Sequence, residues 1–141
     1  GTGWIVEMLG AIPIPDTIES TKKFLKQIEK RINQKNSITI YPEAHIWPFY
    51  TGIRNFKSVS FKYPVKLNTP VYSITNTYQT YGKKRNKIKI VSYIDGPFYP
   101  DEGLKIKEAT EQLRNEVYDA MIARSKNSNI EYIKYIKKAS E

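Results

Sequence analysis

The chain has 141 residues, of which 40% are hydrophobic and 26% charged, as in an ordinary globular domain with a core of its own. It contains no cysteine, which excludes disulfides and thiolate chemistry, and no apolar run of about 18 residues, so no transmembrane helix is predicted. The formal net charge of +9 favours polyanions: nucleic acid, an anionic membrane face or a phosphorylated substrate.

The basic residues are 18 Lys and only 5 Arg. Because specific phosphate recognition uses the Arg fork, this excess of Lys indicates solvated surface first. The chain opens on Gly1 rather than Met and runs at once into an apolar stretch at Trp4. We therefore expect a piece of a longer protein, with residues 1–141 as a single domain, a core at about 4–124 and a basic tail at 125–141.

In the first third of the chain, the sequence predicts a strand, a helix and a second strand. Residues 11–14 read as a short strand, and a helix begins at Asp16, with Glu19 completing a capping box. Apolar side chains recur at helical spacing until the helix ends near Gln34, and residues 37–41 read as a buried strand. This order predicts a parallel pair with a right-handed crossover.

The middle of the chain predicts a helix followed by two strands. The helix spans 55–67, where Pro64 kinks or shortens it. Strands follow at 71–77 and 87–94, joined by a basic turn, and the second alternates Lys on a wet face with Ile on a buried face. Asp95-Gly96-Pro97 is expected to end that strand.

The last third predicts an amphipathic helix over 104–124, and a short basic helix over 129–138. Together the elements predict an α/β domain with a mixed, mostly parallel sheet and flanking helices.

Glu43 is the best single candidate for a functional residue. It follows Pro42, where the chain must leave the sheet, and ligands of α/β sheets gather beyond the carboxyl ends of strands. The alternatives are that Glu43 caps the next turn or pairs with Arg54.

His45 is the only histidine, so a Ser-His-Asp or Cys-His relay must use it or an upstream residue. The position five residues later is Tyr50 rather than a carboxylate, and beside Trp47 the ring of His45 could simply pack. One His and no Cys do not favour a zinc site, and no metal is expected.

A basic loop at 83–87 is flanked by Tyr78, Tyr81 and Tyr93. Basic residues interleaved with aromatic ones can track single-stranded nucleic acid or sit on anionic headgroups. The alternative is a solvated hairpin.

Four ordered features resemble the 1-acylglycerol-3-phosphate acyltransferase family, the lysophosphatidate acyltransferases and their relatives. Leu9–Ile14 stands where the family has its second sequence block, and Pro42-Glu43 matches its third block, Pro-Glu-Gly-Thr-Arg. The stretch 55–67 resembles the helix that follows, and 69–74 fits the apolar strand of the fourth block. The likeness covers roughly residues 4 to 100.

The chain departs from the family at three positions, two of which bear on phosphate binding. Ala44 replaces the Gly of the third block, Ile46 stands where its Arg is expected, and Asp16 lies where the second block ends in a basic residue. Those basic positions would hold the acceptor phosphate. Their loss suggests a different acceptor, or a phosphate held by Arg54 and Lys57 at the start of the expected helix, where backbone N–H groups favour anions.

The resemblance implies an acyltransferase that moves an acyl group from acyl-CoA or acyl carrier protein to a hydroxyl of a lysophospholipid-like acceptor. The acceptor-binding residues would be Glu43, Arg54, Lys57 and His45, in a partial glycerolipid-acyltransferase-like fold. No cofactor is implied. The family's catalytic His-x4-Asp block does not occur in the sequence, so the catalytic pair is expected upstream of Gly1 and this part alone is expected to be inactive.

The implied location is cytoplasmic and peripheral, at the inner membrane face, with an anionic membrane surface as partner. The fragment is also expected to self-associate through exposed sheet edges and apolar surface. Two alternatives remain open. One is a basic nucleic-acid-binding module, which the charge supports and the Lys excess does not favour. The other is a peripheral membrane or protein-interaction domain without chemistry, supported by the basic tail at 130–138.

Overall fold

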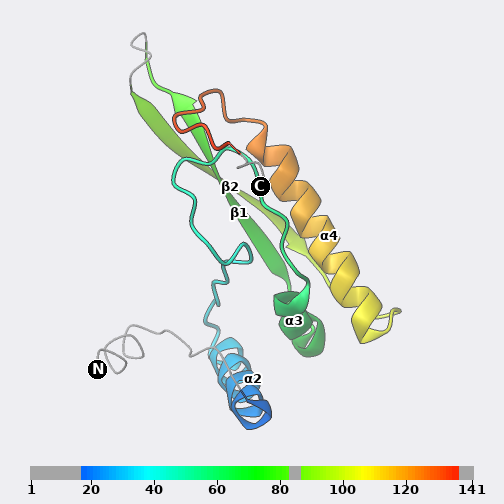
Figure 1. The fold of residues 1–141 in the computed structure, drawn as a ribbon. Helices are drawn as coiled ribbons and strands as arrows, with labels where there is room; N and C mark the ends of the chain where they lie inside the picture. The colour runs from blue at the N-terminus through cyan, green and yellow to red at the C-terminus, as the bar shows by residue number, and fades with distance from the viewer. Residues whose placement is uncertain (1–16, 83–86, 137–141) are drawn as a thin grey trace, which may run out of the picture. The chain divides into compact units, whose positions relative to one another are not determined.

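A computed structural model describes residues 17–82 and 87–136 (Figure 1). The chain divides into two compact units, Gly1–Ile40 and Tyr41–Glu141, and each is described by itself. The strand predicted at 11–14 and the helix start predicted at Asp16 lie outside the described residues.

The first unit contains one described helix, α2 (Ile18–Asn33). Its N-cap is Thr17, whose Oγ1 accepts from the Ser20 N–H at 3.1 Å, while the Ser20 Oγ accepts from the Thr17 N–H at 2.8 Å. This capping box satisfies two N–H groups at the helix start; it uses Thr17 and Ser20 rather than the predicted pair. The predicted end is confirmed, because Gln34 is the C-cap.

Residues 37–41, predicted as a buried strand, form no strand. Ile38 is half-buried, but Ile40 and Tyr41 are 43% and 81% exposed. A β-rich run becomes a strand only when a neighbour accepts its hydrogen bonds, and no strand within residues 17–82 or 87–136 pairs with it. Glu43 therefore does not stand at a strand end.

The sheet of the second unit is a two-stranded antiparallel hairpin of β1 (Val71–Thr80) and β2 (Ile88–Phe98). It is the only sheet in the described part of the chain, so the predicted α/β fold with a mixed, mostly parallel sheet is wrong. The two alternating runs lie close together in the sequence and pair with each other, as consecutive strands commonly do. The two strands were correctly predicted, whereas most of the basic loop predicted between them, at 83–87, lies outside the described residues.

Strand β2 continues through the predicted stop at Gly96-Pro97. The pairing register advances three residues on β2, from Asp95 to Phe98, against two on β1. This is a β-bulge, which takes up an extra residue and lets the ladder resume. Gly96 has φ +122°, a conformation that side chains disfavour, and a Cβ there would lie 2.8 Å from the Val71 carbonyl oxygen.

Helix α4 (Ile106–Ser125) confirms the predicted second helix and runs alongside the hairpin (Figure 1). Its apolar face forms the core with residues before β1. The buried core residues are Phe56, Phe61, Leu113, Val117 and Met121.

The helix predicted for 55–67 is much shorter in the structure. It consists of a 3-10 turn, η1 (Val59–Phe61), followed by α3 (Lys62–Leu67). Pro64 lies in the first turn of α3, where its missing N–H would have had no helical partner. The helix is thus shorter at its N-terminal side than predicted, in agreement with the prediction that Pro64 kinks or shortens it.

The hairpin buries a different face from the one that the sequence predicted. Toward α4 lie Ser73, Thr75 and Thr77, which are at most 4% exposed. Ile74 and Ile94 lie opposite each other on the other face and are 58% and 68% exposed. The predicted burial of the β2 isoleucines is therefore wrong, because α4 covers the opposite face of the hairpin, which carries Ser73, Thr75 and Thr77.

The tail was predicted as a short basic helix, but residues 129–136 contain none. Among the residues that the structure describes, no helix has the length and apolar character needed to cross a membrane.

Candidate functional site

The candidate site is the irregular loop from Pro42 to Arg54, in the second unit. Its backbone turns sharply at Ala44 and Phe49, whose φ angles of +63° and +59° lie in the left-handed region. These angles are uncommon outside glycine. At Ala44 the backbone thus adopts a conformation for which Gly is better suited.

Glu43 and Arg54, eleven residues apart, meet across this loop. The Glu43 Oε2 accepts from the backbone N–H of Arg54 at 2.8 Å and lies 3.5 Å from its Nε. The two side chains are only 26% and 19% exposed. A charge-assisted hydrogen bond in such a setting stabilises the loop more than an exposed ion pair would.

The Arg54 guanidinium is also held by backbone carbonyls and by an indole ring. Its Nη2 donates to the carbonyl oxygens of Glu43, at 3.0 Å, and of His45. Its Cζ lies 4.7 Å from the centroid of the Trp47 ring, a cation–π contact. In the described part of the chain, Nη1 of Arg54 and Oε1 of Glu43 make no hydrogen bond, so each keeps its hydrogen-bonding capacity.

The other two residues of the predicted set do not join this contact through their side chains. His45 is exposed and contributes its backbone, whose N–H donates to the Glu43 carbonyl at 2.8 Å. Lys57 is exposed and makes no ion pair or hydrogen bond with the described residues. Arg54 does not lie at a helix start, since η1 begins only at Val59.

Arg114 on α4 fixes the chain just after Arg54, a role that the sequence did not reveal. Its Nε and Nη2 donate to the Phe56 carbonyl at 3.0 and 2.8 Å, and Nη2 also donates to Asn55 Oδ1. The guanidinium lies over the Phe56 and Tyr118 rings at 5.0 and 4.4 Å. The end of the loop is thereby attached to helix α4.

Trp47 and Tyr135 were also missed as partners of the site. Their rings stack with centroids 5.0 Å apart. The only signal in the sequence is that aromatic residues are dense in both stretches, 47–50 and 132–135, which are far apart along the chain.

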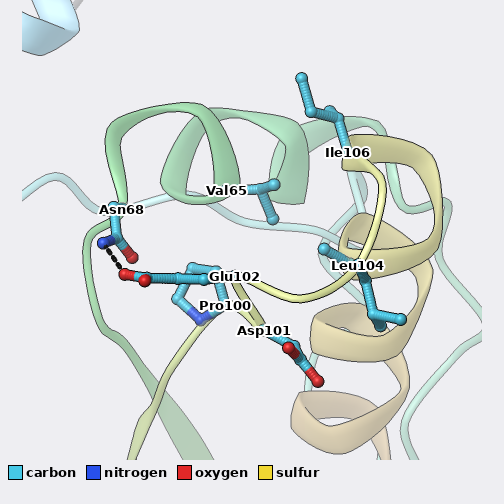
Figure 2. A pocket seen from close by; sticks show the side chains of 8 residues that line it. Val65, Asn68, Pro100, Asp101, Glu102, Leu104 and Ile106 are labelled. Carbon is cyan, nitrogen blue, oxygen red and sulfur yellow. Dashed lines mark hydrogen bonds between the residues drawn. The ribbon is translucent and has the colours of Figure 1, made fainter.

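A cavity of about 270 Å³ lies elsewhere, between α3 and the start of α4 (Figure 2). None of the predicted site residues lines it. Its two carboxylates already accept hydrogen bonds. Asp101 accepts from the Gly103 N–H, and Glu102 accepts from the Asn68 side chain, as Figure 2 shows. The cavity therefore adds nothing to the loop site.

Within residues 17–82 and 87–136, no three His, Cys, Asp or Glu side chains are grouped so as to hold a metal ion. No family model matches the sequence, and no curated protein or solved structure matches it either.

Proposed function

We propose that the loop from Pro42 to Lys57 is the acceptor-binding part of an acyltransferase. The enzyme would move an acyl group from acyl-CoA or acyl carrier protein to a hydroxyl of a lysophospholipid-like acceptor. The thioester C–S bond breaks, an ester C–O bond forms, and the thiol of the donor is released. The family resemblance suggests the reaction, and the loop geometry supports the place of the acceptor.

The observation that carries the proposal is the contact between Glu43 and Arg54. It brings together the Glu of the Pro-Glu pair and the Arg that would replace the family's missing basic residues. Arg54 is fixed through Nε and Nη2 while Nη1 stays available, which suits a guanidinium that binds a phosphate oxygen. Glu43 Oε1 would accept from a hydroxyl of the acceptor.

Lys57 would supply a second positive charge, free of any competing carboxylate among the described residues. The general base would be a histidine that this sequence does not hold. Its only His, His45, is followed at the fifth position by Tyr50. The loop binds and orients the acceptor, and the proton transfer belongs to the family's His-Asp pair.

Lysophospholipid acceptors reside in membranes, so we place the protein peripherally on an anionic membrane face. The net charge of +9 supports this location, because juxtamembrane Lys and Arg residues are attracted to anionic headgroups.

The proposal is tested by titrating the chain with glycerol 3-phosphate and, as a matched control ligand, glycerol. We expect glycerol 3-phosphate to bind and glycerol not to bind. Arg54→Gln should weaken binding by about tenfold or more, as expected for a charge-assisted hydrogen bond. Lys57→Gln should weaken it by up to about fivefold, in the range of an exposed ion pair.

Lys62→Gln is the control, since Lys62 is also exposed and lies outside the loop. Equal binding of glycerol and glycerol 3-phosphate would contradict the proposal. A single-stranded oligonucleotide serves as the competing ligand. If it binds tightly and the Arg54 and Lys57 variants bind it as well as the wild type, the nucleic-acid alternative is favoured instead.

A further inference from the structure

The segment after α4 turns back onto the hairpin and is fastened to the free edge of β1. Ser128 Oγ accepts from the Tyr78 N–H at 3.2 Å, and the Asn129 N–H donates to the Tyr78 carbonyl at 3.0 Å. Asn129 Oδ1 accepts from the Thr80 N–H at 2.9 Å. Residues 127–136, called the clasp below, therefore begin from a defined anchor.

From this anchor the clasp reaches the loop that carries Arg54 (red and cyan in Figure 1). The Tyr132 ring lies 4.9 Å from Phe49, edge to face. Tyr135 stacks on Trp47 at 5.0 Å, meets Tyr50 edge to face at 5.6 Å, and donates its hydroxyl to the Pro48 carbonyl at 2.8 Å.

The contacts continue from the clasp to the guanidinium. Tyr135 stacks on Trp47, and Trp47 in turn lies against Arg54 at 4.7 Å. Trp47 is still 42% exposed, so its packing depends on the few rings that touch it. Offset-stacked and cation–π contacts have a preferred geometry, so losing one ring frees its neighbour to move.

We propose that the clasp positions Arg54 for anion binding, with Tyr135 as the positioning residue that acts through Trp47. The anion-binding role rests on the proposed function; the positioning of Trp47 and Arg54 does not. The tail is on this view a part of the site, supplied from about eighty residues away in the sequence.

The test uses the full chain with Trp4→Phe, which leaves Trp47 as the sole indole. Acrylamide quenching reports Trp47, the NMR signal of the Arg54 Nε–H reports the guanidinium, and titration with inorganic phosphate reports binding. Tyr135→Ala should increase quenching, broaden the Nε–H signal by faster exchange, and weaken phosphate binding about threefold to tenfold, the worth of one aromatic contact.

Tyr135→Phe keeps the stacked ring and removes only the hydroxyl, so it should restore all three readouts nearly to wild type. Tyr99→Ala is the matched control, since Tyr99 is 63% exposed and makes no ring contact with described residues. Thermal unfolding of each variant establishes that the hairpin and α4 remain folded.

If Tyr135→Ala leaves both the quenching and the Nε–H signal unchanged, the clasp does not position the site and the inference is wrong. If these change but phosphate affinity does not, the positioning has no effect on binding, and the inference is equally overturned. If the wild type binds no phosphate while Tyr135→Ala still changes both signals, the positioning stands and the proposed function fails.

Discussion

Arg124, near the end of α4, donates to both carboxylate oxygens of Asp95 on β2. Its Nε lies 2.9 Å from each oxygen, and its Nη2 lies 2.7 Å from Oδ1. The same guanidinium lies over the Tyr93 ring at 4.9 Å. This fork joins the helix to the second strand just before the bulge.

The ion pair predicts an acid-dependent stability. Hydrogen bonds from Arg124 are the largest cause that lowers the pKa of Asp95; desolvation opposes them and the charge of Arg124 adds to them. Because the folded pKa lies below the unfolded one, the stabilisation is present at neutral pH and is lost as the pH falls through the folded pKa. Asp95→Asn should therefore lower the melting temperature at neutral pH, and this deficit should shrink in acid.

The measurement is thermal unfolding of wild type and variant from about pH 7 to about pH 2.5, on both sides of the ordinary Asp pKa. Asp119→Asn is the control, because Asp119 is exposed on α4, the helix that carries Arg124, and makes no ion pair with described residues. A deficit of Asp95→Asn that stays the same across this range would contradict the prediction.

Thr75 and Thr77 have equally buried side chains but differ in hydrogen bonding. The Thr75 hydroxyl has no partner among the described residues, whereas the Thr77 hydroxyl donates to the Val91 carbonyl at 3.1 Å. Thr75→Val should raise the free energy of unfolding by about 1–3 kcal/mol, since an unsatisfied buried hydroxyl is removed. Thr77→Val should lower it by about 0.5–1.5 kcal/mol.

Chemical denaturation of the two variants checks this pair, and each serves as the other's control, because Val and Thr suit a strand equally. Shifts of the same sign and size in both would show that the hydrogen bond of Thr77 is irrelevant to stability.

Leu113 is 1% exposed within the core, and Leu104 is 40% exposed. Leu113→Ala should lower the free energy of unfolding by about 2–5 kcal/mol, because it leaves a cavity. Leu104→Ala, the same change at an exposed position, should cost far less. Urea unfolding, followed by circular dichroism, measures both variants. Similar losses in the free energy of unfolding would mean that Leu113 of α4 does not contribute to the core as proposed.

Ala44→Gly should be neutral or raise the free energy of unfolding by up to about 1 kcal/mol. The positive φ of Ala44 costs an L-residue about 1–2 kcal/mol, while Gly loses more backbone entropy on folding, by about 0.5–1 kcal/mol. Ala123→Gly on exposed helix surface is the control and should cost about 0.5–1 kcal/mol. The prediction is wrong if Ala44→Gly lowers the free energy of unfolding as much as Ala123→Gly does.

The sequence predicted those elements whose pattern is local. The face of α4 that carries Leu113 and Val117 repeats at helical spacing, and β1 and β2 are two alternating runs close together in the sequence. Residues 37–41 look like a strand by composition, but composition cannot show whether a partner strand lies beside them. The parallel sheet was inferred from that missing strand, so the fold class failed with it.

The sequence predicted the contact between the two ends of the candidate loop, but not the residues that hold the loop from elsewhere in the chain. Pairing of Glu43 with Arg54 was one of the two structural alternatives for Glu43, and it is the arrangement found. Arg114 and Tyr135 could not be assigned to the site, because they reach the loop from 58 and 87 residues away, at Phe56 and Pro48. Contacts of that range follow from the fold and leave no periodic trace in the sequence.

The anchor at Tyr78 and Thr80 has a consequence for how copies of the chain can meet. The outer edge of a two-stranded ribbon offers unpaired N–H and C=O groups on which a foreign strand can grow. Ser128 and Asn129 occupy those groups near the C-terminal end of β1, at Tyr78 and Thr80. Any intermolecular β-ladder must therefore displace the tail before it can extend along that stretch.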